Sequence, residues 1–206
     1  MRIIGLCGGS GSGKGAVSDF LSGRGIPCID LDQVYHSLTS SDSLCLRELK
    51  AEFGEEIIST DGSLDRVRLR DIVFAGGQAE KKLKKLNEIT HKHVIFRAEE
   101  ELSRLCLAGH SLAVVDAPLL FESGYDKKCQ LTVAVLADRA LRIERIRQRD
   151  GLSEEEAVQR IDSQMSDGEL ARRADYTVYN NGTYSELTSS CERLIKKIEM
   201  EFRDEG

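Results

Sequence analysis

The sequence predicts an α/β fold, in which a parallel sheet of about five strands carries helices on both faces. Two observations lead to this prediction. Short apolar runs alternate with helical patterns along most of the chain, and a glycine-rich segment joins the first run to the first helical pattern. Strands that alternate with helices form βαβ units, and the strands of such units lie parallel.

Five apolar runs bounded by turns are the expected strands, and they cover residues 2–7, 25–30, 112–115, 131–136 and 176–179. Apolar residues at helical spacing predict helices over residues 14–23, 140–149, 153–165 and 184–202. Residues 33–107 break this alternation, because they contain helical patterns, the longest over 81–107, a turn at 59–63 and no convincing strand. We interpret the chain as a single unit, 1–206, with a helical insertion at 33–107.

Composition excludes several classes of protein. The 206 residues include 29 Lys and Arg against 35 Asp and Glu, a net charge of −6, which argues against a general nucleic-acid binder. No apolar stretch approaches the ~18–20 residues that span a bilayer, and the N-terminus is too short for a signal peptide, so we expect a cytoplasmic protein without a membrane partner. The six cysteines form no CxxC pair, which leaves a zinc or redox site with little support.

A phosphate-binding loop is the clearest motif. Residues 8–14 read Gly-Gly-Ser-Gly-Ser-Gly-Lys, which fits the pattern G-x-x-x-x-G-K between a strand and a helix. Glycines let backbone N–H groups converge on phosphate oxygens, and the helix N-terminus adds unpaired donors. The expected nucleotide contacts are Gly9, Ser10, Gly11, Ser12, Gly13, Lys14, Gly15 and Ala16. Gly15 and Ala16 stand where a Ser or Thr would ligate Mg²⁺, so the protein ligand of that ion is left open between Ser12, Asp32 and Asp116.

Carboxylates end two of the expected strands. Asp30 and Asp32 follow the second strand, and if the chain stays extended there, both side chains lie on one side of it. A carboxylate in this place can orient a substrate hydroxyl and accept its proton, whereas the alternative is that Asp32 caps a helix through residues 35–38. Asp116 ends the third strand, where it either holds Mg²⁺ through water or acts as a cap or ion-pair partner.

An arginine-rich helix follows the fourth strand. Arg142, Arg145 and Arg149 fall at i, i+3 and i+7, which places them on one helix face. Such a helix can form a movable lid that neutralises phosphates and excludes water, or it can be a solvated face paired with Glu144 and Asp150.

Taken together, these motifs resemble the dephospho-coenzyme A kinase family over nearly the whole chain. The matching segments are 8–14, 29–32, 64–66, 69–74, 86–91, 118–122, 148–150, 174–176 and 180–182, with Arg145 and Gln164. The resemblance implies a three-layer P-loop kinase fold with a helical substrate domain and a lid, here 139–168. It also implies transfer of a phosphoryl group from ATP, with Mg²⁺, to the ribose 3′-hydroxyl of dephospho-CoA, and thus a phosphotransferase with small-molecule partners.

The resemblance assigns roles to individual residues. Asp32 matches the catalytic carboxylate and contacts the acceptor, Lys14 neutralises the migrating charge, and Arg145 and Arg149 match lid positions. His91 matches a histidine of the substrate domain that is usually followed by proline, whereas Lys92 follows here, which could alter a helix start. Pro118 and Leu119 belong to the segment that the resemblance assigns to substrate binding.

Two other functions fit the same motifs. A P-loop kinase of another nucleoside or nucleotide would have the same loop and lid. A nucleotide-binding switch protein without catalytic activity would explain the missing hydroxyl after Lys14, but it would leave Asp32 and the lid arginines without a role.

Overall fold

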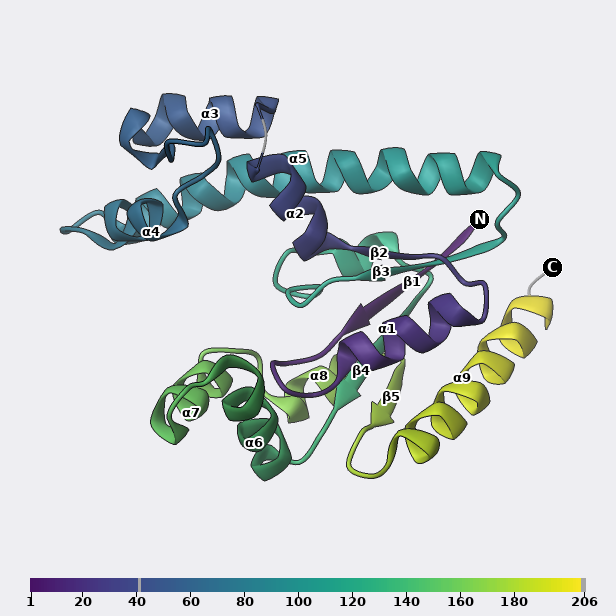
Figure 1. The fold of residues 1–206 in the computed structure, drawn as a ribbon. Coiled ribbons are helices and arrows are strands. Elements are labelled where there is room, and N and C mark those ends of the chain that lie inside the picture. Colours follow the sequence, from purple (N-terminus) through teal and green to yellow (C-terminus); the bar gives the residue numbers. More distant parts are fainter. Residues whose placement is uncertain (41, 205–206) are drawn as a thin grey trace. The chain divides into compact units, whose positions relative to one another are not determined.

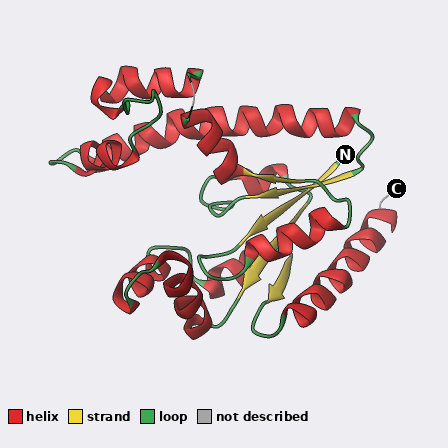
Figure 2. Ribbon diagram, viewed as in Figure 1, coloured by secondary structure: helices red, strands yellow, loops and turns green. Residues whose placement is uncertain are grey.

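The computed structural model describes residues 1–40 and 42–204, and its secondary structure is that of an α/β protein (Figure 1, Figure 2). The chain divides into two compact units, one made of Met1–Cys28 with Gly109–Gly206 and the other of Ile29–Ala108. The strands are β1 (Arg2–Cys7), β2 (Cys28–Asp30), β3 (Leu112–Asp116), β4 (Leu131–Leu136) and β5 (Tyr176–Tyr179). The helices of the first unit are α1 (Lys14–Gly23), the 3₁₀ helix η2 (Tyr125–Lys128), α6 (Arg139–Asp150), α7 (Glu154–Asp162), α8 (Asp167–Arg173) and α9 (Tyr184–Asp204).

The five strands form one parallel sheet in the order β2-β3-β1-β4-β5, so the predicted fold class and all five predicted strands are confirmed. β1 lies in the middle, with β3 on one side and β4 on the other. Leu6 is in register with Asp116 of β3, and Cys7 is in register with Ala134 of β4. The glycine-rich loop therefore leaves the sheet at the end of its central strand, where ligands bind in open parallel sheets.

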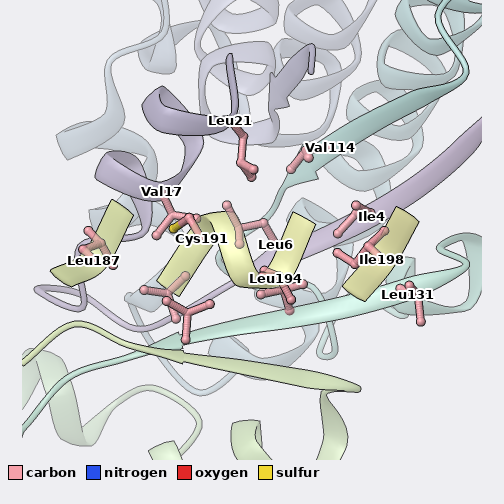
Figure 3. Close-up of a cluster of buried hydrophobic side chains, with 13 residues drawn as sticks. Ile4, Leu6, Val17, Leu21, Val114, Leu131, Leu187, Cys191, Leu194 and Ile198 are labelled. Carbon is pink, nitrogen blue, oxygen red and sulfur yellow. The ribbon is translucent and has the colours of Figure 1, made fainter. Parts of the chain in front are cut away.

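The core of the first unit lies between the sheet and two helices, α1 and α9 (Figure 3). Apolar side chains of the strands pack against Val17 and Leu21 of α1. On α9 the buried residues recur at helical spacing, which gives that helix one apolar face: Leu187, Cys191, Leu194 and Ile198.

The second unit is built on one long helix, α5 (Ala79–Leu107), which confirms the predicted helix over residues 81–107. Its other elements are α2 (Leu31–Thr39), α3 (Leu44–Phe53), the 3₁₀ helix η1 (Glu55–Ile57) and α4 (Arg66–Phe74). Side chains of α3, α4 and α5 share one apolar core that includes Leu49, Val73 and Ile89. Ser59 N–H donates to the carbonyl of Ser63 at 2.8 Å, which confirms the predicted turn.

The region after α6 differs from the prediction. A single helix was expected over residues 153–165, but α7 ends at Asp162 and a separate helix, α8, begins at Asp167. Ser166 separates them because its hydroxyl accepts the backbone N–H of Glu169, which is the arrangement of a helix N-cap. Seven residues are too few for periodicity to reveal α8 in the sequence.

The six cysteines are free. Burial is the main cause that raises the pKa of Cys7 and of Cys129 to about 12, so these thiols are protonated packing groups. Within residues 1–40 and 42–204 no helix combines the length and the apolar character needed to cross a membrane.

We expect Ile198→Ala to lower the free energy of unfolding by about 2–5 kcal/mol, because it leaves a cavity between α9 and the sheet. Met200→Ala, two residues further along α9 at a side chain that is 64% exposed, is the matched control and should change it by less than about 0.5 kcal/mol. Urea unfolding measures both values. Equal losses in the two variants would contradict the assignment of this helix face to the core.

Candidate active site

The glycine-rich loop connects β1 to α1, and its last glycine is the N-cap of that helix. Gly13 has φ 89° and no side chain, so no side-chain hydrogen bond caps the first turn of α1. The first N–H groups of a helix have no carbonyl of a preceding turn to bind, although here those of Ala16 and Val17 donate to the carbonyl of Gly13. With the helix dipole they form an anion-binding site at the end of the central strand.

Lys14, the last residue of the motif, forms an ion pair with Asp116 at the end of β3. Asp116 is only 3% exposed, so this carboxylate needs a cation beside it. The ion-pair alternative for Asp116 is therefore present in the structure, and its partner is the lysine of the phosphate loop.

The site contains few side chains that can hold a metal ion. Ser12 is fully buried, its Oγ has no hydrogen-bond partner, and a Cβ on Gly8 would lie 2.8 Å from this atom. This hydroxyl is a buried polar atom at the loop with no hydrogen-bond partner, so Ser12 stays among the proposed ligands. In the described part of the chain no group of three or more His, Cys, Asp or Glu side chains is placed to hold a metal. Asp116 is the carboxylate that pairs with the lysine of the loop, and Mg²⁺ in kinase sites commonly uses one or two carboxylates with substrate phosphates.

Side chains from α6 and from the segment after β5 bind the backbone of the loop. Arg145 donates to the carbonyl oxygens of Gly11 at 3.2 Å and of Asn180 at 3.0 Å. Asn180 is buried, and its Nδ2 donates to the carbonyl oxygen of Ser12 at 2.9 Å. Arg145 therefore lies at the loop, and its role in a lid stays a prediction.

Arg142 and Gln164 contact the loop at Ser10, although neither was assigned to the site from the sequence. Arg142 Nε donates to the carbonyl oxygen of Ser10 at 2.8 Å, and Gln164 Oε1 accepts the Ser10 N–H at 2.8 Å. The signal for Arg142 was the helical spacing that puts it on the face of Arg145, and the signal for Gln164 was its place among the positions that match the kinase family. Nothing in that spacing distinguishes a buried arginine from a solvated one.

The third arginine of that face behaves differently. Arg149 is exposed and donates to both carboxylate oxygens of Asp150, at 2.8 and 2.9 Å. This hydrogen bond is the main cause that lowers the pKa of Asp150 to about 2, and Arg160 adds to it. Of the three arginines predicted on one face, Arg142 is thus buried, Arg145 half-buried and Arg149 exposed. Nucleotide contact by Arg149 stays a prediction.

In the second unit, the carboxylates after β2 do not share an extended segment. The chain turns into α2 at Leu31, and Asp30 is its N-cap, whose carboxylate accepts the N–H groups of Asp32 and Gln33. The expectation that Asp30 and Asp32 lie on one side of an extended chain is therefore wrong. The alternative that Asp32 is the cap is also wrong, because Asp32 lies exposed in the first helical turn.

His91 lies in the middle of α5. The helix continues through Lys92, so the residue that replaces the usual proline does not create a new helix start. Lys92 Nζ donates to Glu48 of α3 at 2.8 Å. His91 is half-buried, and burial lowers its pKa.

The segment after β3 contains one exposed apolar side chain. Leu119 is 52% exposed, whereas the neighbouring Leu120 is fully buried. Arg173 stacks over the ring of Phe121, with 4.5 Å between the guanidinium carbon and the ring centroid. Leu119 is therefore accessible for a ligand, and Pro118, half-buried, precedes it.

Comparisons with known proteins agree with these features. The profile of the family described as dephospho-CoA kinase matches residues 2–186. The dephospho-CoA kinase of Anaeromyxobacter dehalogenans is 38% identical over 198 residues, which are 96% of this chain and 92% of that protein. Among solved structures, TT1252 from Thermus thermophilus has a TM-score of 0.79 and 34% identity, and 97% of each chain is covered. The dephospho-CoA kinase of Campylobacter jejuni has a TM-score of 0.69 and 25% identity, with coverage of 96% and 98%.

We expect Gly11→Ala to destabilise the first unit by about 1–3 kcal/mol. Gly11 has φ 78°, and an added Cβ would lie 2.6 Å from the backbone oxygen of Arg142. Gly15→Ala is the matched control, because its Cβ would meet nothing within 4 Å, and it should stabilise α1 by about 0.5–1 kcal/mol. Urea unfolding measures both. A neutral Gly11→Ala would show that the loop does not approach α6 this closely.

The lowered pKa of His91 predicts a pH dependence of stability. Below pH 6.5, the ordinary pKa of histidine, the unfolded chain binds a proton at His91 before the folded chain does, so the free energy of unfolding falls as the pH is lowered toward the folded pKa. His91→Gln should therefore flatten the stability profile below pH 6.5. Asn87→Gln, at an exposed position of the same helix with no titratable group, is the control and should leave the slope unchanged. The free energy of unfolding is measured between pH 8 and pH 5. The prediction is contradicted if both variants keep the wild-type slope.

Proposed function

Because the chain belongs to the dephospho-CoA kinase family, we propose that it transfers the γ-phosphoryl group of ATP to the ribose 3′-hydroxyl of 3′-dephospho-CoA, giving ADP and coenzyme A. The observation that carries this proposal is the loop at the N-terminus of α1, whose carbonyl groups are bound by other side chains. We assign the reaction to the cytoplasm. We also assign it to small-molecule substrates, since a net charge of −6 does not suit a nucleic-acid partner.

ATP binds with its phosphates on the loop. The loop from Gly9 to Ala16 holds the phosphates, chiefly through the backbone N–H groups of Gly11 and Gly13, and Lys14 exchanges Asp116 for the β- and γ-phosphates. The phosphates then replace Asp116 as the negative charge that neutralises Lys14. Arg145 lies against Gly11, so its charge is placed to stabilise the migrating phosphoryl group.

The departure of Lys14 leaves the buried carboxylate of Asp116 without its cation. Mg²⁺ that arrives with ATP suits this position, and Asp116 is the residue that would hold it. When bound, the ion neutralises charge on the β- and γ-phosphate oxygens.

Asp32 is the proposed base of the reaction. Its carboxylate accepts the proton of the 3′-hydroxyl while that oxygen forms a bond to the γ-phosphorus. The bond from the γ-phosphorus to the β–γ bridging oxygen breaks, and ADP leaves with the electron pair. Asp32 also orients the acceptor, and we assign the rest of acceptor binding to His91, Pro118 and Leu119.

Two segments have proposed roles as wholes. Residues 33–107 hold the acceptor, and residues 139–168 form the lid, in which Arg149 contacts nucleotide. Support for the lid comes from α6, which contacts the loop through Arg142 and Arg145.

ADP release in the presence of ATP and Mg²⁺, measured with a panel of acceptors, tests the function. We expect turnover with dephospho-CoA to exceed turnover with any nucleoside or nucleoside monophosphate by at least about 100-fold. A preference for a nucleoside or its monophosphate would reassign the chain to another acceptor. Nucleotide binding without ADP formation from any acceptor would favour the switch protein instead.

We expect Asp32→Asn to lower kcat by at least about 100-fold and to change the affinity for ATP only a few-fold, because the amide cannot accept the proton. Asp42→Asn is the matched control in the same unit, at an exposed carboxylate paired with Arg47, and it should leave kcat near the wild-type value. Steady-state kinetics with varied ATP and dephospho-CoA separate the two effects. Near-normal turnover of Asp32→Asn would refute the assignment of the base.

A further inference from the structure

One residue of the phosphate loop, Ser10, has all its polar groups bound by the segment from α6 to α8. Its N–H donates to Gln164 Oε1 at 2.8 Å, and its Oγ accepts from Gln164 Nε2 at 3.2 Å. Its carbonyl oxygen accepts from Arg142 Nε at 2.8 Å. Two side chains therefore determine the orientation of both peptide groups that flank Ser10.

Ser10 is the first of three consecutive residues whose carbonyl groups accept a side-chain hydrogen bond. The second carbonyl, of Gly11, accepts from Arg145, and the third, of Ser12, accepts from Asn180. We call these three contacts the carbonyl brace of the loop. Its donors come from α6 and from the segment after β5, not from the loop itself.

The brace determines where the N–H groups point. In a trans peptide the carbonyl of one residue and the N–H of the next point in opposite directions, and the described chain contains no cis peptide bond. Carbonyls that point toward α6 and Asn180 therefore turn the N–H groups of Gly11 and Gly13 the other way. The N–H of Ser12 closes a turn onto the carbonyl of Gly9 at 3.1 Å.

Arg142 is itself fixed in position. Its side chain is 3% exposed, and besides Ser10 it donates to Asp167 Oδ1 at 2.6 Å and to Gln164 Oε1 at 3.3 Å. A Cβ on Gly9 would collide with its guanidinium group. Asp167 supplies a matching negative charge, so Arg142 acts on the loop through hydrogen bonds more than through net charge.

We propose that Arg142, oriented by Asp167 and Gln164, is a positioning residue that holds the phosphate loop in its anion-binding shape before the nucleotide arrives. This inference rests on the proposed function only in that the loop binds the phosphates of ATP. A loop without the brace would have to be ordered when nucleotide binds, and that entropy cost weakens binding. The effect is specific to phosphates, because the brace acts on the N–H groups that receive them.

The test compares ADP with adenosine, which lacks phosphates. Arg142→Met keeps much of the side-chain volume and removes every donor, and we expect ADP affinity to fall about 10-fold or more with adenosine affinity unchanged. Arg142→Lys retains a charge and one point donor and should restore part of the ADP affinity. Arg147→Met is the matched control on the same helix, since Arg147 is 51% exposed and pairs only loosely with Glu154 at 3.8 Å. It should change ADP affinity less than two-fold.

Calorimetry gives the ADP affinities, and competition against ATP gives those of adenosine. Wild-type ADP affinity in Arg142→Met overturns the proposal, and so does a parallel loss of ADP and adenosine, which indicates a general loss of structure. If Arg142→Met does not fold, Arg142→Lys provides the test. A loss of ADP affinity with unchanged adenosine affinity supports the brace, and unchanged ADP affinity refutes it. ADP binding requires no acceptor, so a failure of the acceptor panel leaves this test intact.

Discussion

Backbone N–H groups that converge on one point repel one another, and this constraint governs the site. The loop meets it by giving the opposing carbonyls of Ser10, Gly11 and Ser12 partners outside the loop. Those partners follow β4 and β5, and they lie on the same side of β1 as the loop's neighbours because β4 pairs with β1 and β5 pairs with β4. The strand order β1-β4-β5 is therefore a condition for the loop's shape as well as a feature of the fold.

The helix that supplies two of these partners is held in place by its own packing. Ile146 of α6 is fully buried against Ala157 and Ile161 of α7. Ser153 and Glu156 form a capping box at the start of α7, and Arg139 binds both carboxylate oxygens of Asp162. These contacts hold α6 and α7 together, so Arg142 and Arg145 reach the loop from one packed pair of helices.

Sequence patterns predicted the elements that periodicity and turn chemistry specify. The five strands and the long helix α5 have strong apolar patterns, and the loop has a fixed spacing. What the patterns missed depends on single contacts across the fold. Whether Asp30 or Asp32 caps α2 depends on where the chain leaves β2, and that is a matter of one residue. Likewise, helical spacing placed Arg142, Arg145 and Arg149 on one face and could not tell them apart. In the structure Arg142 and Arg145 contact the loop, whereas Arg149 binds Asp150.

The three cations at the loop differ in whether a carboxylate neutralises their charge. Lys14 pairs with the buried Asp116, and Arg142 pairs with Asp167, so each has a carboxylate that neutralises it before nucleotide binds. The described hydrogen bonds of Arg145 go to two carbonyl groups, which are dipoles and leave its net charge available. An acidic chain with a net charge of −6 can thus present a cation to ATP without an open basic surface. In the proposed function, shape and charge are then separable properties of two residues on α6: Arg142 would determine the direction of the N–H groups, and Arg145 would supply the field in which the phosphoryl group moves.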